Sequence, residues 1–154
     1  MRKVFVMMVG IPGSGKTTIR NLLFPHAEIL CPDDIIGYTK DDPWTPRAAK
    51  DAWKECDRKF SQHTNPNCQT EYLVFDATFT KPKVRKKYLD IAKKEDILCI
   101  AVFCEVKQKT AINRNLTRNA ERQVPDMVMG RMSQNLVAPS KDEGFDHIIC
   151  VQND

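Results

Sequence analysis

Apolar residues occur along this chain in short runs that are separated by amphipathic stretches. The runs predict β-strands at residues 3–9, 28–31, 72–76, 97–103 and 147–151. Strands that alternate with helices in sequence form βαβ units, in which the strands of one sheet run parallel. The pattern therefore predicts a three-layer α/β/α domain with a central, mainly parallel sheet of about five strands.

The stretches between the strands have the period of helices. They predict helices at residues 17–23, 45–63, 81–95, 107–119 and 125–136. The helix at 45–63 has typical start signals, with Thr45 as its cap and Pro46 in the first helical position. Turn-forming residues predict loops at 38–44, 65–69 and 139–144.

The first strand is followed by "GIPGSGKT", residues 10–17, which has the form G-x-x-x-x-G-K-T. Glycines at this spacing allow a tight loop whose N–H groups turn inward around phosphate, and the next helix directs its positive end at the same anion. Lys16 is expected to reach the β and γ phosphates, and the Thr17 hydroxyl suits Mg²⁺. We therefore expect ATP and Mg²⁺ as cofactors, with the nucleotide held by Gly10, Pro12, Gly13, Ser14, Gly15, Lys16, Thr17 and Thr18.

Length and composition suit one globular domain over residues 1–154, with 42% hydrophobic and 29% charged residues. No apolar run approaches the ~20 residues that span a bilayer, and the phosphate loop stands where a signal peptide would carry its cleavage site. We therefore expect a cytoplasmic protein with no membrane partner. The six cysteines form no C-x-x-C pair and indicate reduced thiols that lie mostly in the core, and Met127, Met129 and Met132 favour core filling.

Carboxylates follow two predicted strands at the edge where a parallel sheet binds its ligands. Asp33 and Asp34 follow the second strand in "CPDDII", and Asp76 ends the third in "LVFDATFT", with Thr78 two residues on. Asp33 and Asp34 could accept a hydroxyl proton, orient Mg²⁺ or only cap a helix in a surface turn. Asp76 is placed to support Mg²⁺ or substrate beside the phosphate loop.

Positive charge is concentrated in the second half of the chain. Residues 76–131 contain 13 Lys and Arg against 7 Asp and Glu, within a net charge of +4. Arg114, Arg118 and Arg122 recur every fourth residue and share a helical face, or a face and the loop after it, where an anion would relieve their repulsion. A second basic run, "KPKVRKK" at 81–87, could follow a nucleic-acid backbone.

The set "GIPGSGKTT", "CPDD", "FDATFTKP", "RNLTRNAERQVPDMVMGRM" and "EGFDHI" resembles the kinase domain of the polynucleotide 5′-kinase family of phages and animals. The resemblance covers nearly the whole chain. It implies a phosphate-loop kinase fold with an Arg-bearing lid, and transfer of the γ-phosphoryl group of ATP to the 5′-hydroxyl of DNA or RNA. A nucleic acid with a 5′-hydroxyl end would then be the partner and substrate.

The resemblance also implies roles for single residues. Asp33 matches the general base, Arg118 matches the lid arginine that contacts the donor phosphates beside Arg114 and Arg122, and Lys16 completes the catalytic set. The acceptor site would comprise Asp33, Asp34, Asp76, Thr78 and Val124. The chain departs from the family at Cys31 and Pro32, where members have Asn-Arg, and at Ile36, where some have Arg.

Two other functions remain open from the sequence. A small-molecule kinase acting on a nucleoside, sugar or antibiotic hydroxyl would use the same loop, Asp33 and lid, and would differ only in its acceptor pocket. A nucleotide-dependent switch would need no carboxylate base opposite an Arg lid.

Overall fold

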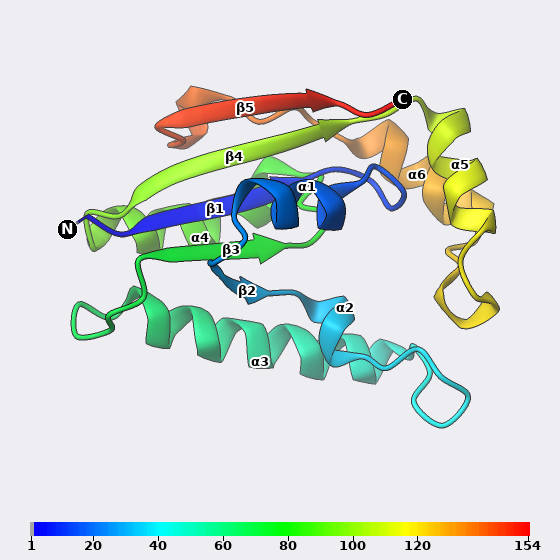
Figure 1. Cartoon of the computed structure of the whole chain (residues 1–154), viewed down its shortest axis with the longest axis horizontal. Helices are drawn as coiled ribbons and strands as arrows, with labels where there is room; N and C mark the ends of the chain where they lie inside the picture. The colour runs from blue at the N-terminus through cyan, green and yellow to red at the C-terminus, as the bar shows by residue number, and fades with distance from the viewer. Residues whose placement is uncertain (1) are drawn as a thin grey trace.

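A five-stranded sheet forms the centre of the protein, in the order β2-β3-β1-β4-β5 (Figure 1). The computed structural model describes residues 2–154. The strands are β1 (Val4–Val9), β2 (Glu28–Leu30), β3 (Tyr72–Asp76), β4 (Leu98–Glu105) and β5 (His147–Gln152). Every neighbouring pair is parallel, which confirms the predicted architecture with strand ends shifted by one or two residues.

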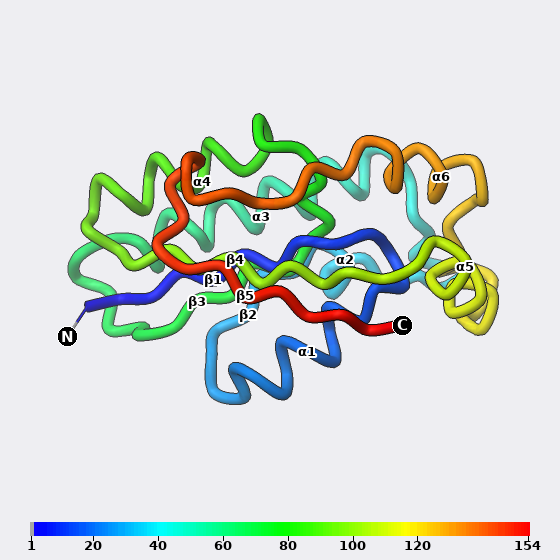
Figure 2. The backbone as a smooth tube through the Cα atoms, turned by 90° about the horizontal axis from the view of Figure 1, so that it is seen from above, coloured from blue at the N-terminus to red at the C-terminus, as the bar shows by residue number. Residues whose placement is uncertain are grey.

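Helices cover both faces of the sheet. They are α1 (Lys16–Leu23), α2 (Pro32–Ile35), α3 (Pro46–Thr64), α4 (Pro82–Lys94), α5 (Gln108–Leu116) and α6 (Asp126–Asn135), with short 3₁₀ turns η1 (Ala120–Arg122) and η2 (Lys141–Glu143). Figure 2 shows α1 on one face and α3 and α4 on the other, so the domain has three layers. Among residues 2–154, no helix is both long and apolar enough to cross a membrane.

Side chains alternate between the two faces of the sheet and build a separate core on each. Phe5 and Met7 of β1 pack with the aromatic residues under α3 and α4, whereas Val6 and Met8 pack beneath α1. A third, smaller cluster joins Ile11 of the phosphate loop to the helices α5 and α6. The phosphate loop is therefore packed against the segment expected to form the lid.

Two local structures differ from the sequence expectations. The helix expected at 107–119 ends at Leu116, so Arg118 and Arg122 lie beyond α5, in the loop and in η1. The sequence left two arrangements open for the three arginines, and the structure has the second. Arg114 lies on the helix, and the other two lie in the segment after it. A short unpredicted helix, α2, begins with Pro32 and carries Asp33 and Asp34 in its first turn.

The sulfur-containing side chains follow the prediction except at Met127. All six cysteines are free, and four of them are buried: Cys31, Cys56, Cys99 and Cys104. Met129 lies in the core, but Met127 is 76% exposed, so the prediction that it fills the core was wrong. Met127 lies in the first turn of α6, on the side that faces away from the phosphate loop cluster.

Arg85 corrects the prediction that the whole run 81–87 could follow a nucleic-acid backbone. Its side chain is fully buried and forms a two-bonded ion pair with Glu143, at 2.8 and 3.1 Å. The same guanidinium donates to the carbonyls of Phe79 and Val137. Arg85 therefore joins the loop after β3 to the segment after α6, and it contributes no surface charge.

Replacing Arg85 with methionine should destabilise the fold. The methionine keeps most of the volume but leaves the Glu143 carboxylate and two carbonyls without their donor, and breaking a buried ion pair costs about 3 kcal/mol or more. The matched control is Lys86→Met, because Lys86 forms an exposed pair with Asp90 that contributes at most about 1 kcal/mol. Urea denaturation measures both variants, and equal losses would contradict a special role for Arg85.

Candidate active site

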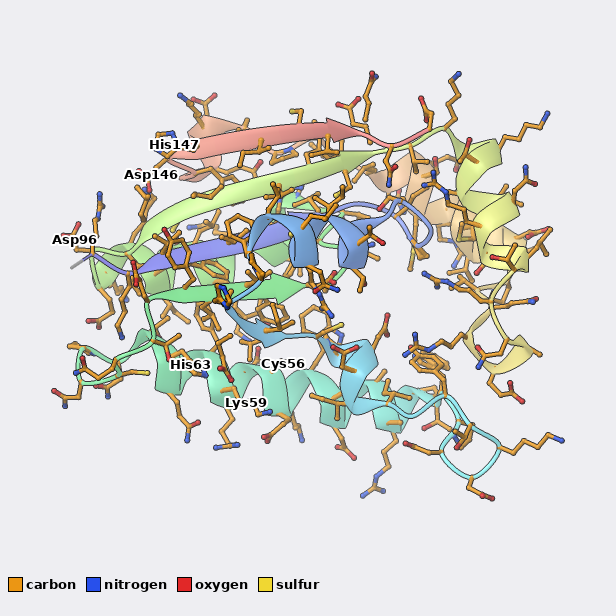
Figure 3. The ribbon with its side chains drawn as sticks, viewed as in Figure 1. Cys56, Lys59, His63, Asp96, Asp146 and His147 are labelled. Atoms are coloured by element: carbon orange, nitrogen blue, oxygen red, sulfur yellow. The ribbon has the colours of Figure 1, made fainter. Side chains whose placement is uncertain are left out.

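The two ends of the sheet carry different polar groups. At the amino ends of the strands, Asp96 pairs with Arg2, and the Asp146 carboxylate accepts a hydrogen bond from the backbone of Cys99 (Figure 3). These groups are occupied by structural contacts. The phosphate loop, α2 and α5 lie at the opposite, carboxyl end, where open parallel sheets bind ligands (Figure 1).

The loop between β1 and α1 has the backbone that a phosphate cradle requires. Gly13 and Gly15 adopt positive φ angles of 83° and 87°, which other residues rarely reach. A Cβ atom at Gly13 would also stand 2.6 Å from the carbonyl oxygen of Ala111 in α5. Gly15 is the N-cap residue of α1 and has no side chain that could bond the N–H groups of the first helical turn. These N–H groups are therefore available to an anion. The residues present therefore fit a nucleotide phosphate.

Lys16 lies folded over this loop. Its ammonium group donates to the carbonyls of Gly10 and Ile11, at 2.9 and 3.0 Å. Burial lowers the pKa of Lys16 and the charge of Arg118 adds to this effect, whereas Asp76 and Asp33 oppose it. Lys16, Arg118, Asp76 and Asp33 therefore lie near enough to one another for their charges to interact.

Asp76, Thr17 and Arg20 form the inner polar group of the site. The Asp76 carboxylate is buried and accepts hydrogen bonds from the Thr17 hydroxyl at 3.3 Å and from Arg20 at 2.9 Å. Burial raises the pKa of Asp76, and the charges of Lys16 and Arg20 oppose this shift. Among residues 2–154, no group of three His, Cys, Asp or Glu could hold a metal, so Mg²⁺ would depend on these oxygens together with nucleotide phosphates.

The structure separates the two adjacent carboxylates of α2. Asp34 pairs with Arg20 at 3.3 Å, and Arg20 also binds Asp76. Asp33 has no cation partner among residues 2–154, and its carboxylate accepts a hydrogen bond from the Tyr38 hydroxyl at 2.6 Å. Asp34 is thus held by a structural ion pair, whereas Asp33 binds a hydroxyl group.

The three arginines predicted to face an anion have different environments. Arg114 donates to the carbonyls of Gly13 and Asn153, at 3.1 and 2.7 Å, and so braces the phosphate loop from outside. Arg118 is exposed beyond α5 and acts on Lys16 electrostatically. Arg122 lies 5.1 Å over the ring of Tyr38, which is in the loop after α2. The cluster therefore connects three parts of the site and does not form one patch.

The remaining predicted residues lie around this site. Ser14 turns its buried hydroxyl toward Gly10, and Pro12 is also buried. Neither has a free backbone N–H for a phosphate, because Pro12 has none and that of Ser14 donates to the Ile11 carbonyl at 3.1 Å. Thr18 is exposed in the first turn of α1. Thr78 accepts a hydrogen bond from the Gly10 backbone, and Val124 is held at both backbone groups by the Asn115 amide.

Sequence reasoning missed three residues of the site. Arg20 holds Asp34 and Asp76 together, and its position one turn after Lys16 on the same helix was a signal that could have found it. Tyr38 lies in a loop between predicted elements, and Asn153 follows the last strand and donates to the Ser14 carbonyl at 3.2 Å. No local sequence pattern points to these two contacts.

A protein-family comparison accounts for most of the chain. The model of the family described as "AAA domain" matches residues 5–139, from β1 to the loop after α6. The chain belongs to this AAA domain family. The matched range includes the phosphate loop, Asp33, Asp76 and all three arginines. No curated protein matches the sequence.

Solved structures share the fold of this AAA domain at low sequence identity. A candidate kinase from Chloroflexus aurantiacus is 15% identical over 97% of this chain and 85% of its own, with a TM-score of 0.74. A gluconokinase from Sinorhizobium meliloti is 14% identical over 99% of this chain and 84% of its own, with a TM-score of 0.62. A chain of the AvrRxo1-ORF1:AvrRxo1-ORF2 complex with ATP is 14% identical over 85% of this chain and 46% of its own, with a TM-score of 0.68.

Proposed function

We propose that this AAA domain is an ATP-dependent phosphotransferase that moves the γ-phosphoryl group of ATP to a hydroxyl group of a small molecule, such as a sugar, a sugar acid or a nucleoside. The proposal rests on one observation, which is that the carboxylates near Lys16 have different bonding partners. Arg20 forms ion pairs with Asp34 and Asp76. Asp33 pairs with no cation among residues 2–154 and accepts a hydrogen bond from a hydroxyl group.

In this proposal each residue has a role set by its contacts. Asp33 accepts the proton of the acceptor hydroxyl as its oxygen attacks the γ-phosphorus. Lys16 exchanges the carbonyls of Gly10 and Ile11 for phosphate oxygens, and Arg118 adds positive charge over the transferred group. Thr17 and Asp76 would hold Mg²⁺, which neutralises charge on the phosphates when it is bound.

The surface charge supports the choice of acceptor class. Of the basic run 81–87, Arg85 is buried, Lys86 pairs with Asp90, and Lys87 pairs with Asp57. Within the run 81–87, Lys81 and Lys83 are exposed and form no ion pair with any of residues 2–154. The continuous basic track expected for a polynucleotide acceptor is therefore absent from the described surface of α4, and a sugar-acid kinase is among the structures that share the fold. Both observations favour a small acceptor over the 5′-end of a nucleic acid.

An acceptor panel tests the proposal. The protein is incubated with labelled ATP and gluconate, neutral sugars, nucleosides, or DNA and RNA oligonucleotides with 5′-hydroxyl ends. Label should pass to a small acceptor, with at least about a tenfold preference in kcat/KM over any oligonucleotide. ATP binding without transfer to any acceptor would favour a nucleotide-dependent switch.

Salt dependence separates the two acceptor classes. A polynucleotide acceptor would give an affinity that falls with salt at a log–log slope of roughly −0.7 per neutralised phosphate. The double variant Lys81→Gln/Lys83→Gln would flatten this slope, whereas it should leave transfer to a small acceptor unchanged. Preferred transfer to an oligonucleotide with a steep, Lys81- and Lys83-dependent slope would replace our proposal with polynucleotide 5′-kinase activity.

A further inference from the structure

Tyr38 is held in an unusual position beside the candidate base. It lies in the loop after α2 with a φ of 55°, in the left-handed region that residues with a side chain rarely adopt. The loop is closed around it, because the Asp42 carboxylate accepts from the Gly37 backbone at 2.7 Å and Thr39 bonds Asp42 through both its backbone and its side chain. Strain of this kind persists only where surrounding contacts maintain it, and it is common at functional sites.

The Tyr38 hydroxyl is hydrogen-bonded to Asp33, the candidate base. It donates to Asp33 Oδ1 at 2.6 Å, which is a short hydrogen bond to an acceptor that can carry charge. Burial raises the pKa of Tyr38, and the neighbouring Asp33 raises it further. The phenol therefore keeps its proton at neutral pH and remains a donor. An acceptor hydroxyl that gives its proton to Asp33 would need the same place.

The ring of Tyr38 is in contact with the lid segment. The Arg122 guanidinium lies 5.1 Å from the ring centroid, within the range of a cation–π interaction. Arg122 belongs to η1, between α5 and α6, whereas Tyr38 belongs to the loop after α2. Two segments far apart in sequence thus meet at the side chain whose hydroxyl binds Asp33.

We propose that Tyr38 is a gating residue, whose hydroxyl occupies Asp33 until the acceptor displaces it and so keeps water from reacting with ATP. This inference rests on the proposed function and adds to it a device for choosing the acceptor over water. A kinase must suppress hydrolysis, because water is a smaller nucleophile than any acceptor and is always present. With Asp33 Oδ1 already hydrogen-bonded to a phenol, a water molecule beside the γ-phosphate must compete with that phenol for the base.

The reaction that the gate suppresses is hydrolysis of ATP. The water oxygen bonds to the γ-phosphorus, the bond from that phosphorus to the bridging oxygen of ADP breaks, and the water proton passes to Asp33. The products are ADP and inorganic phosphate, and no other reactant is required. Transfer to an acceptor follows the same course with the acceptor hydroxyl in place of water.

Tyr38→Phe removes the hydroxyl and keeps the ring under Arg122. Release of ADP without acceptor should rise about tenfold, since one hydrogen bond to a charged group shifts an equilibrium by about that factor. The acceptor KM should fall, because the acceptor no longer competes with the phenol, and kcat at saturating acceptor should stay within about twofold. A coupled assay for ADP and a phosphate assay measure these quantities.

Two further variants control this experiment. Tyr88→Phe is matched, because the Tyr88 hydroxyl also donates at 2.6 Å to a carboxylate, that of Asp57, between α3 and α4. It should leave the hydrolysis rate at the native value. In the double variant Tyr38→Phe/Asp33→Asn the gain in hydrolysis should disappear, because the base that the gate covers is gone.

Hydrolysis that is unchanged or lower in Tyr38→Phe would overturn the gate, as would a tenfold fall in kcat, which would mean that Tyr38 only positions Asp33. Phosphate found on Tyr38 by mass spectrometry after incubation with ATP would also overturn it, since the hydroxyl would then be an acceptor itself. Failure of the native protein to transfer phosphate to any acceptor would instead remove the proposed function.

Discussion

Replacing Lys16 with methionine is expected to abolish phosphoryl transfer without unfolding the protein. The ammonium group lies over the phosphate loop, bound to the carbonyls of Gly10 and Ile11, and it is the cation nearest to where the γ-phosphate would lie. Losing one preorganised positive group at a transferring phosphoryl group costs about 10²–10³ in kcat or more. Transfer of labelled phosphate, measured at saturating ATP, gives the loss directly.

Stability provides the control for Lys16→Met. Burial lowers the pKa of Lys16, which means that the folded protein disfavours its charged form. Removing that charge while keeping an unbranched side chain should therefore leave the urea midpoint unchanged or slightly raised. Native turnover in this variant would place the catalytic site elsewhere, and loss of turnover together with loss of folding would leave Lys16 with a structural role only.

The fold could be predicted because its signals are local. A parallel strand within a sheet is a short apolar run, and each of the five strands contains one, although the edge strands β2 and β5 are largely exposed. The Thr45 cap also formed as expected, with its hydroxyl accepting from the Ala48 backbone at 3.0 Å. Helix ends were less certain, because α5 stops at Leu116 with no residue there that marks an end.

The site could be predicted only where a motif determines geometry. The spacing of Gly10, Gly15, Lys16 and Thr17 fixes a loop conformation, and the structure has the positive φ angles that it implies. Asn153 reaches the site from 139 positions beyond Ser14, so its contact depends on how the chain crosses the sheet. Tyr38 follows Asp33 by only five residues, but their contact depends on a loop in which Tyr38 has a φ of 55°, and no short-range pattern encodes that conformation.

Charge was the weakest guide to function. Arg85 stands in a run of basic residues and is fully buried, because Glu143, 58 positions later, supplies its carboxylate. A count of basic residues includes Arg85 in the surface charge, whereas in the folded protein its side chain is buried and connects two loops. Arg114 is similar, since its guanidinium binds two backbone carbonyls behind the phosphate loop. The basic surplus of residues 76–131 therefore overstates the charge available to a ligand.

Asp33→Asn is expected to lower the transfer rate by about 10²–10⁴, the usual contribution of a general base. The asparagine keeps the size of the side chain but cannot accept the acceptor proton. ATP affinity should change little, because no contact joins Asp33 to the phosphate loop among residues 2–154 and its charge acts on Lys16 only at a distance. Single-turnover transfer and equilibrium ATP binding separate the two effects.

Asp34→Asn is the matched control for this prediction, since it makes the same chemical change one residue further along α2. Asp34 pairs with Arg20, which retains Asp76 at 2.9 Å when Asp34 is neutralised, so transfer should fall less than about tenfold. The ratio of the two losses assigns the base. If Asp34→Asn loses more of the rate than Asp33→Asn does, Asp34 is the base. Asp33, which Tyr38 contacts, would then take no part in the reaction. If Asp33→Asn weakens ATP binding as much as transfer, its carboxylate belongs to the metal site, and the hydroxyl that it binds in this structure does not represent the acceptor.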